Sequence, residues 1–384
     1  MHVMIVPSWY ATEFNKVHGS FFKEQALALQ RSGIKVSIAF NEIWPLSRLG
    51  RIKSKRGLSC KNEDGLTTYR YKNYNYLPKN PRMFNIFNRR MEKIYKSIVE
   101  KEGKVDVIHA HSALWGGISA AYISQKYGIP LVLTEHSSLK YAQYLKDSYR
   151  KYVYEAYMNS NKLVSVSESL KTELQNYVSN KDIVVINNIV DFNNFTLDKR
   201  NDSYNETEKF TFFSCAFLEP DKGMDILIKA FNKGFKNSEN VVLRIGGAGR
   251  AVEELKSLIE ELDLKDKVML LGALSREEVS EEMQKCNCFA LASRHETFGM
   301  VYVEALASGK PVIGTKNGGA EEIINENNGL LVEIDNTEEL CEAMKYIYCN
   351  LNKYTSEMLR KECEEIYSEK NIVSRIKSVY EEVL

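Results

Sequence analysis

The sequence predicts an α/β protein built from two doubly wound parallel-sheet domains that face a cleft. Its 384 residues are long for one hydrophobic core and suit two domains of ordinary size. Short apolar runs alternate with amphipathic segments, a pattern typical of parallel strands covered by helices on both faces. The alternation occurs in two series, and the polar stretch 198–209 between them is the expected linker. In such sheets ligands bind beyond the carboxyl ends of the strands, so the site is expected there and between the domains.

The apolar periodicity divides each series into expected elements. In the first series, strands are expected at 3–6, 36–40, 105–110, 131–134, 163–166 and 183–186, with helices at 21–32, 82–101 and 117–127. In the second series, strands are expected at 210–215, 241–245, 268–271, 288–292, 311–314 and 329–332, with helices at 224–232, 251–262, 276–284, 298–308 and 320–325. Two terminal helices are expected at 337–351 and 355–384.

Charge is distributed unevenly along the chain. Residues 1–190 hold 28 Lys and Arg against 15 Asp and Glu, a net charge of +13, whereas residues 191–384 hold 24 against 36, a net charge of −12. The basic half is therefore expected to be attracted electrostatically to the acidic half or to an anionic surface. No signal peptide and no apolar run of membrane-spanning length is found, so a cytoplasmic protein is expected. Seven cysteines without CxxC spacing indicate reduced thiols rather than a disulfide framework or a zinc site.

The strongest chemical signal lies at 294–314, where a strand end, a loop and a helix follow one another. Glu296 lies on the loop, and Phe298 opens the helix. The free N–H groups and partial positive charge of a helix N-terminus suit an anion such as a diphosphate. Glu304 lies among apolar residues of this helix, where an unpaired carboxylate costs on the order of several kcal/mol. A ribose diol would satisfy this carboxylate, and a salt bridge in the core is the alternative.

These residues resemble the signature of the family 4 glycosyltransferases, retaining enzymes with the GT-B fold. The family has two Glu separated by seven residues, then a small-residue helix end and Pro-Val, as in Glu296, Glu304 and 311–312 here. The resemblance covers essentially the whole chain. It implies an acceptor-side domain at 1–195 and a nucleotide-sugar donor domain at 205–365, and it leaves open that the terminal helix 366–384 crosses back to the first domain.

The resemblance also implies roles for individual residues. Glu304 would bind the donor ribose, and Glu296 would contact hydroxyls of the transferred sugar. The start of the helix would bind the sugar and phosphate through Thr297, Phe298, Gly299, Met300 and Val301.

Lys222 comes before a glycine at an expected strand-to-helix turn, where a compact cation can reach a phosphate. A surface lysine is the alternative, but the resemblance implies that Lys222 binds the leaving phosphate. The family pattern has Gly and Arg where this chain has Ala216 and Phe217. One of two expected cations is therefore missing, and Arg294 is a candidate replacement.

A glycine-rich turn begins at Gly246 and opens a helix. Val252 stands at the third glycine position of a dinucleotide fingerprint, so the turn is weak evidence for NAD. The resemblance places Gly246 and Gly272 near the nucleotide base.

In the first domain, Gly19 and Ser20 open a helix after the first strand, and Gly19 permits close approach of a ligand. His136 follows the expected strand 131–134, and the resemblance implies that it binds the transferred sugar or holds the acceptor. A structural histidine is the alternative. His109 and His111 are expected on opposite faces of their strand, as structural or cleft-lining residues rather than a metal pair.

The basic half carries a further signal. A cluster of cations is expected in a loop and comprises Arg48, Arg51, Lys53, Lys55, Arg56 and Lys61. The amphipathic helix 82–101 suits either the surface of an anionic membrane or an ordinary core-facing position. Peripheral attachment to the inner face of a membrane therefore stays open. No pattern indicates binding to nucleic acid.

The chain has no Asp-x-Asp motif, so neither a metal ion nor a cofactor is expected. Lys222 and the helix opening at Phe298 are expected to stabilise the departing nucleoside diphosphate, with UDP favoured. The expected acceptor is a saccharide or lipid-linked hydroxyl in the synthesis of surface polysaccharide, glycolipid or cell envelope. Three alternatives stay open: a sugar-nucleotide epimerase of the same architecture, a non-catalytic nucleotide-sugar-binding partner subunit, and an NAD oxidoreductase.

Overall fold

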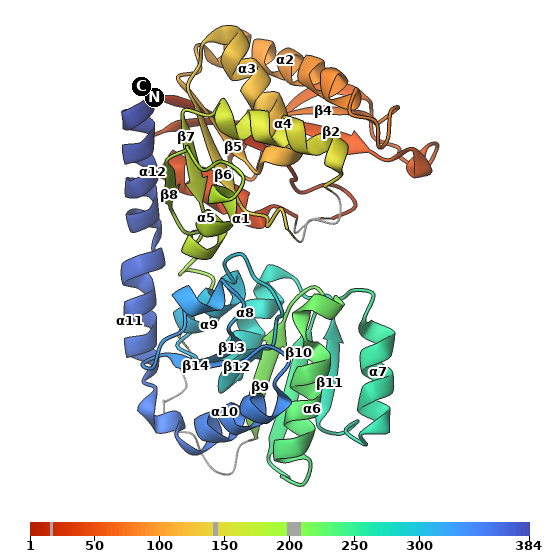
Figure 1. Ribbon diagram of the computed structural model, residues 1–384, viewed down its shortest axis with the longest axis vertical. Helices are drawn as coiled ribbons and strands as arrows, with labels where there is room; N and C mark the ends of the chain where they lie inside the picture. Colours follow the sequence, from red (N-terminus) through yellow and green to blue (C-terminus); the bar gives the residue numbers. More distant parts are fainter. Residues whose placement is uncertain (16–17, 141–144, 198–208) are drawn as a thin grey trace. The chain divides into compact units, whose positions relative to one another are not determined.

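The computed structural model describes residues 1–15, 18–140, 145–197 and 209–384. These residues form two compact units, of which unit 1 comprises Met1–Ile189 with Glu369–Leu384 and unit 2 comprises Val190–Ser368 (Figure 1). The final helix of the chain thus belongs to the first unit. The expected linker at 198–209 lies, apart from its last residue, outside the described residues.

Unit 1 is an α/β unit with an eight-stranded sheet in the order β3-β4-β2-β1-β5-β6-β7-β8. All neighbouring strands are parallel except the antiparallel pair β3 and β4. The strands are β1 His2–Pro7, β2 Lys35–Trp44, β3 Gly57–Glu63, β4 Leu66–Tyr74, β5 Val107–His111, β6 Leu131–Glu135, β7 Lys162–Ser165 and β8 Ile183–Val185. The helices are α1 Ser20–Arg31, α2 Met83–Glu102, α3 Ile118–Tyr127, α4 Asp147–Met158, α5 Glu168–Gln175 and α12 Glu369–Val383, with short turns η1 Leu46–Arg48 and η2 Ala113–Gly117.

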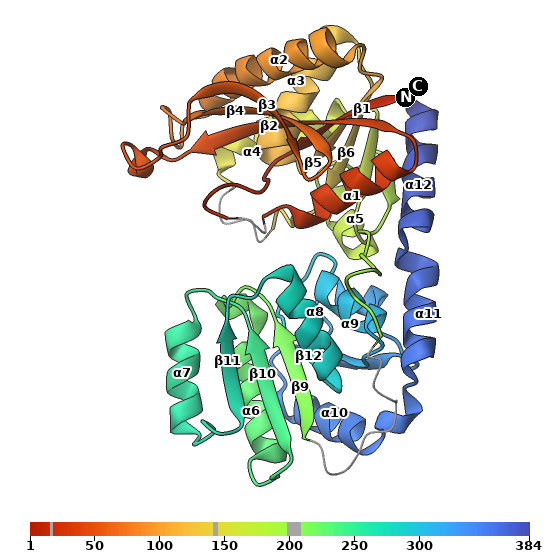
Figure 2. The ribbon, with the colours of Figure 1, turned by 180° about the vertical axis from the view of Figure 1, so that it is seen from behind.

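Helices α1 and α12 pack against each other over one face of this sheet (Figure 2). Ile372, Ile376 and Tyr380 of α12 share a buried core with Val107 of β5 and Val132 of β6. Helix α3 contacts both α2 and α4, and α2 packs on β2 and β4. The sheet is therefore covered on both faces, as parallel strands require.

Unit 2 has a six-stranded, fully parallel sheet in the order β11-β10-β9-β12-β13-β14. The strands are β9 Phe210–Cys215, β10 Val241–Gly246, β11 Val268–Gly272, β12 Cys288–Leu291, β13 Val312–Thr315 and β14 Gly329–Val332. The helices are α6 Met224–Phe235, α7 Val252–Glu261, α8 Arg276–Lys285, α9 Met300–Ala307, α10 Thr337–Cys349 and α11 Ser356–Tyr367, with turns η3 Pro220–Lys222, η4 Ala320–Glu322 and η5 Leu351–Lys353. Helix α6 contacts α7 and α10, and α8 contacts α9. The prediction of two doubly wound parallel sheets is confirmed.

Several expected elements differ from the structure. The loop expected to hold the basic cluster ends in β3, an edge strand whose polar side chains hid it from periodicity analysis. Helices α4 and α5 were not predicted, and the expected helix 320–325 is only the short turn η4. The expected helix 355–384 is two helices, because the backbone at Ser368 is extended (φ −65°, ψ 151°).

Helix α2 has its apolar face in the core, so the alternative that this face lies on a membrane is wrong. Met83, Phe84, Phe87, Met91 and Ile94 are each at most 1% exposed. Their burial leaves only the polar side of the helix for solvent. Among the described residues, no helix combines the length and apolar character needed to cross a membrane.

Candidate functional site

The centre of the candidate site in unit 2 is an ion pair between Lys222 and Glu296. Lys222 Nζ lies 2.8 Å from Glu296 Oε1, which also accepts a hydrogen bond of 2.8 Å from Ser293 Oγ. The two charged side chains are only 20% and 16% exposed. Burial lowers the pKa of Lys222, but the charges and hydrogen bonds of Glu296 and Asp221 outweigh burial, so the net shift is upward. Lys222 therefore stays a cation at neutral pH.

Lys222 is placed by the turn between β9 and α6. It ends η3, and Gly223 follows in the left-handed region at φ 61°. A Cβ at Gly223 would lie 1.9 Å from the carbonyl oxygen of Ala292, just after β12. Glycine is required there because any side chain would push the lysine turn away from the strand that leads to Glu296.

Helix α9 begins at Met300, four residues after Glu296. Gly299 forms its N-cap at φ 93°, so the chain turns into the helix through a conformation that favours glycine. The amides of Met300 and Val301 begin the helix and have no intrahelical acceptor by geometry. Phe298 is buried, and its carbonyl oxygen would lie 2.7 Å from a Cβ at Gly319. The predicted helix N-terminus thus follows Glu296 in the chain, with Met300 as its first residue.

The loop that carries Glu296 is fastened to the end of β13. Glu296 N donates to Asn317 O at 3.3 Å, and Thr315 Oγ1 donates to Ser293 O. Asn317 Oδ1 accepts from the amide of Ala320 at 3.0 Å. These side chains were not predicted as site residues, although their place after a strand end is a signal for such a role.

Arg294 is engaged by acidic partners within unit 2. Its Nε lies 2.7 Å from Asp335 Oδ1, its Nη2 lies 3.3 Å from Asp225 Oδ1, and its Nη1 donates to Pro220 O. All three guanidinium nitrogens therefore have protein acceptors. Arg294 is therefore better suited to positioning the Lys222 turn than to replacing the arginine that the family pattern has at position 217. Phe217, which stands there in this chain, is 64% exposed.

Glu304 is 2% exposed and accepts a hydrogen bond from Arg276 Nη1 of α8. The Arg276 guanidinium also lies 4.9 Å from the centre of the Phe195 ring. The salt bridge that the sequence left open as an alternative is thus present. It does not test ribose binding, because an arginine can hold the carboxylate in place for a ligand.

The glycine turn after β10 is explained by close packing of the backbone. A Cβ at Gly247, where φ is 136°, would lie 1.9 Å from Ala216 O, and one at Gly249 would lie 2.2 Å from Leu218 O. A Cβ at Gly246 would lie 2.5 Å from the Leu274 side chain. Gly272 has open space instead, at φ 78°. The turn is therefore shaped by its neighbours within unit 2.

In unit 1, three histidines lie together at the carboxyl ends of β5 and β6. His111 Nδ1 lies 3.0 Å from His136 Nε2, and the His109 and His111 ring centres are 4.4 Å apart. The expectation that His109 and His111 point to opposite faces was wrong, because side chains two residues apart return to the same face of a strand. Burial lowers the pKa of His136, with help from His109, to about 3, and burial alone lowers that of His109 to about 3.

Three buried polar atoms near these histidines have no partner among the described residues: His111 Nε2, His136 Nδ1 and Ser112 Oγ. Such atoms are rare in folded proteins and call for a ligand or a water. Ser112 and Trp115 also have positive φ angles of 63° and 74°, which is uncommon for residues other than glycine. Unpartnered atoms and backbone strain thus coincide where the sequence predicted an active-site role for His136.

Glu135 was missed by the sequence analysis and organises this region. Its buried carboxylate accepts hydrogen bonds from Ala113 N at 2.9 Å, His136 N at 2.9 Å, Ser137 N at 3.0 Å and Tyr157 Oη at 2.7 Å. It therefore ties the segment after β5 to the segment after β6. Only the three-dimensional arrangement reveals these donors.

Gly19 is the N-cap of α1 in the left-handed region, and Ser20 is the first residue of that helix. A Cβ at Gly19 would lie 2.8 Å from Trp9 O. Packing against the segment after β1 thus requires a glycine here. Over the described part of the chain, no group of three or more His, Cys, Asp and Glu is arranged to hold a metal ion.

Comparison with known proteins identifies the family. The family described as Glycosyl transferases group 1 matches residues 196–362, and the one described as Glycosyltransferase Family 4 matches residues 19–194. An uncharacterised glycosyltransferase of Methanocaldococcus jannaschii is 35% identical over 297 residues, which cover 76% of this chain and 79% of the relative. The N-acetyl-alpha-D-glucosaminyl L-malate synthase of Bacillus anthracis is 27% identical over 297 residues, covering 74% and 77%.

Solved structures share the fold. Sucrose-phosphate synthase of Thermosynechococcus elongatus matches with a TM-score of 0.79 and 18% identity, over 99% of this chain and 98% of that one. Anabaena HepE in complex with UDP matches with a TM-score of 0.75 and 19% identity over the whole of both chains. The two parallel-sheet units and these matches show that the chain belongs to glycosyltransferase family 4 and is a glycosyltransferase with the GT-B fold.

Proposed function

We propose that this glycosyltransferase moves a sugar from a UDP-sugar to a hydroxyl acceptor, with retention of the anomeric configuration and without a metal ion. The observation that carries the proposal is the Lys222 and Glu296 ion pair at the opening of α9. A cation, a helix N-terminus and a carboxylate together suit a diphosphate that carries a polyhydroxylated sugar. HepE, whose fold is similar, was crystallised with UDP-glucose, which supports UDP as the donor nucleotide.

In the proposed reaction, the bond between the anomeric carbon and the β-phosphate oxygen breaks while the acceptor oxygen bonds to that carbon. The proton of the acceptor hydroxyl goes to the leaving phosphate. Lys222 and the amides of Met300 and Val301 stabilise the charge that develops on the diphosphate. Glu296 accepts hydrogen bonds from sugar hydroxyls and orients the ring, and Glu304 holds the ribose.

His136 is proposed to bind the transferred sugar or the acceptor from unit 1. Since burial keeps its pKa near 3, the ring is neutral at physiological pH and acts through hydrogen bonds rather than as a cation. Its Nδ1 and the neighbouring Ser112 Oγ, both buried and without a partner among the described residues, are the atoms proposed to hydrogen-bond to ligand hydroxyls. Gly19 and Ser20 at the start of α1 are proposed to approach the same ligand.

The acceptor is proposed to be a saccharide or lipid-linked hydroxyl on the cytoplasmic side of a membrane, in surface polysaccharide, glycolipid or envelope synthesis. Names among the relatives include a phosphatidylinositol N-acetylglucosaminyltransferase subunit and an alpha-monoglucosyldiacylglycerol synthase, which favours a lipid acceptor. The human subunit is 28% identical, and the matched part covers 58% of its length.

The test is a transfer assay with purified protein, several UDP-sugars and acceptors, and a chelator. We expect an acceptor glycoside whose anomeric configuration, read by proton NMR, equals that of the donor. An inverted product, or activity that disappears with the chelator and returns with a divalent ion, would contradict the corresponding part of the proposal. A changed sugar still attached to UDP would indicate an epimerase.

A non-catalytic nucleotide-sugar-binding subunit remains the second candidate, because exposed Phe217 stands where the family pattern has arginine. Tight binding of UDP-sugars with no transfer to any acceptor would favour this second candidate.

A further inference from the structure

One end of unit 1 combines exposed apolar and basic side chains. This end, here named the tip, comprises residues 43–58 and 74–82 together with Phe14. It includes the carboxyl ends of β2 and β4, the turn η1 and the start of β3. It lies away from α12 on the same unit, where the ribbon of η1 projects beyond the sheet (Figure 1).

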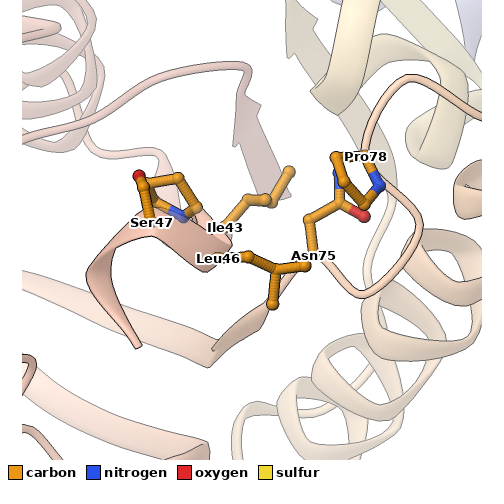
Figure 3. A pocket seen from close by; sticks show the side chains of 6 residues that line it. Ile43, Leu46, Ser47, Asn75 and Pro78 are labelled. Carbon is orange, nitrogen blue, oxygen red and sulfur yellow. The ribbon is translucent and has the colours of Figure 1, made fainter. Parts of the chain in front are cut away.

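A hollow of about 360 Å³ opens within the tip. Figure 3 shows Ile43 and Leu46 of the β2 side facing Asn75 and Pro78 of the β4 side. Pro45 and Ser47 complete its lining. The lining is mostly apolar and includes no charged residue, so the hollow suits a hydrocarbon group better than a polar one.

The surface around the hollow exposes large apolar side chains. Leu49 is 63% exposed, Tyr76 49%, Phe14 44%, Leu58 41% and Leu46 37%. Single exposed apolar residues are normal on a soluble protein, but a group of them on one end marks an interaction surface.

Cations outnumber acids around these apolar groups, although the Glu13 carboxylate accepts a hydrogen bond of 3.0 Å from Ser54 Oγ within the tip. Segments 43–62 and 65–91 contain no Asp or Glu. The exposed cations of the tip, none of which has a carboxylate partner within 4 Å among the described residues, are Arg48, Arg51, Lys53, Lys55, Arg56, Lys79 and Arg82. Arg48 lies 4.1 Å from the centre of the Phe14 ring, and Arg56 donates to Tyr76 Oη at 3.4 Å, so cations and apolar groups are interleaved.

We propose that the tip docks on an anionic lipid bilayer, with Leu46, Leu49 and Tyr76 entering the interface and the cations contacting lipid phosphates. The interfacial region of a bilayer offers anionic phosphates to the cations and hydrocarbon to the apolar side chains. A nucleic acid would satisfy the cations, but exposed leucines beside an apolar hollow have no counterpart on a phosphate backbone. The docking surface is separate from helix α2, whose apolar face is buried, and it does not depend on the proposed transfer reaction.

The first experiment is sedimentation of the purified protein with phosphatidylcholine vesicles, with and without about 30% phosphatidylglycerol, at about 0.1 M salt. We expect binding to the anionic vesicles only, and its loss near 1 M salt. The triple variant Arg51→Gln, Lys53→Gln, Lys55→Gln should bind roughly 100-fold more weakly, since each cation near an anionic surface contributes about fivefold. The matched control changes three exposed lysines away from the tip, Lys101, Lys104 and Lys151, to Gln and should bind as the wild type does.

The second experiment separates apolar insertion from simple charge attraction. Leu49→Ser should weaken binding to anionic vesicles about tenfold. Leu384→Ser, which changes a leucine of nearly equal exposure (64%), should not weaken it. A labelled single-stranded oligonucleotide serves as the competing polyanion, and circular dichroism verifies that each variant is folded.

The proposal is overturned if wild-type protein ignores anionic vesicles or if both triple variants lose binding equally. It is also overturned if Leu49→Ser has no effect, or if the oligonucleotide binds more tightly than the vesicles through the same cations. Because the readout is sedimentation, failure of the transfer assay would leave this result unaffected.

Discussion

Lys222 Nζ lies 2.8 Å from Glu296 Oε1, although the two residues are separated by 73 intervening positions and come from different strand-to-helix connections of unit 2. One connection follows β9 and the other follows β12, and these two strands are neighbours in the sheet. Adjacent parallel strands deliver their following loops to the same edge, which is why two distant motifs meet. The pair joins the proposed phosphate-binding cation to the proposed sugar-binding acid.

Removing the cation should reduce catalysis. Lys222→Ala is expected to lower kcat about 10²- to 10³-fold, because a preorganised positive charge on the leaving group is lost. Steady-state kinetics with the best UDP-sugar measures this change. Lys233→Ala on the same helix α6 is the matched control, since Lys233 pairs with exposed Glu338 on the surface. Equal kinetics in the two variants would contradict the role of Lys222.

Removing the charge of the acid should separate sugar recognition from nucleotide binding. Glu296→Gln keeps the size of the side chain, and we expect a large loss of kcat with little change in the affinity for UDP alone. Calorimetric titration of UDP and a kinetic assay of the UDP-sugar measure the two effects. Glu253→Gln on exposed α7 is the control. A parallel loss of UDP affinity would show that Glu296 acts on the nucleotide instead.

The glycine turn after β10 should tolerate substitution according to the space at each position. Gly247→Ala places a Cβ 1.9 Å from Ala216 O. The free energy of unfolding should therefore fall on the order of several kcal/mol, because the new side chain clashes with the backbone and has an unfavourable φ. Gly272→Ala meets no atom within 4 Å, and only its φ of 78° costs about 1 kcal/mol. Urea denaturation of both variants measures the difference. Similar losses would contradict the packing explanation.

Stability of unit 1 should fall in mild acid because of its buried histidines. Burial lowers the pKa values of His109 and His136 to about 3 in the folded protein, from the ordinary histidine value of 6.5 in an unfolded chain. The stability that comes from their neutral forms is complete above pH 6.5 and is lost as the pH falls towards 3. The slope is about 1.4 kcal/mol per pH unit for each histidine.

Tryptophan fluorescence during urea denaturation at pH 7.5, 6 and 5 follows this unit, because Trp9, Trp44 and Trp115 all lie in it. These pH values lie on both sides of about 6.5, the ordinary pKa of histidine. The variant His136→Asn should show a shallower decline than the wild type. An unfolding free energy that stays constant over this range would show that the histidines are solvated.

Much of unit 2 could be predicted from sequence because its strands are buried on both faces and read as apolar runs. Strand β12 and the opening of α9 were expected within two residues of their observed positions. The edge strand β3 was not, since alternate exposure of polar side chains looks like a loop. The break at Ser368 was also hidden, because helix-forming residues lie on both sides of it.

The sequence names candidate site residues but not their contacts. The spacing of Glu296 and Glu304 identifies two acids, yet only the fold shows that Arg276, from another helix, holds Glu304. Likewise, a sequence cannot show that Asp225 and Asp335 engage Arg294. The prediction for His109 and His111 was wrong for another reason. The two-residue period of a strand already places both side chains on one face, so the sequence was sufficient to predict this correctly.

The most direct test of the central claim is a crystal structure of this chain with a UDP-sugar bound. We expect a β-phosphate oxygen within hydrogen-bond distance of Lys222 Nζ and of the amides of Met300 and Val301, with a sugar hydroxyl on Glu296. A diphosphate bound elsewhere, with Lys222 and Glu296 still contacting only each other, would contradict it.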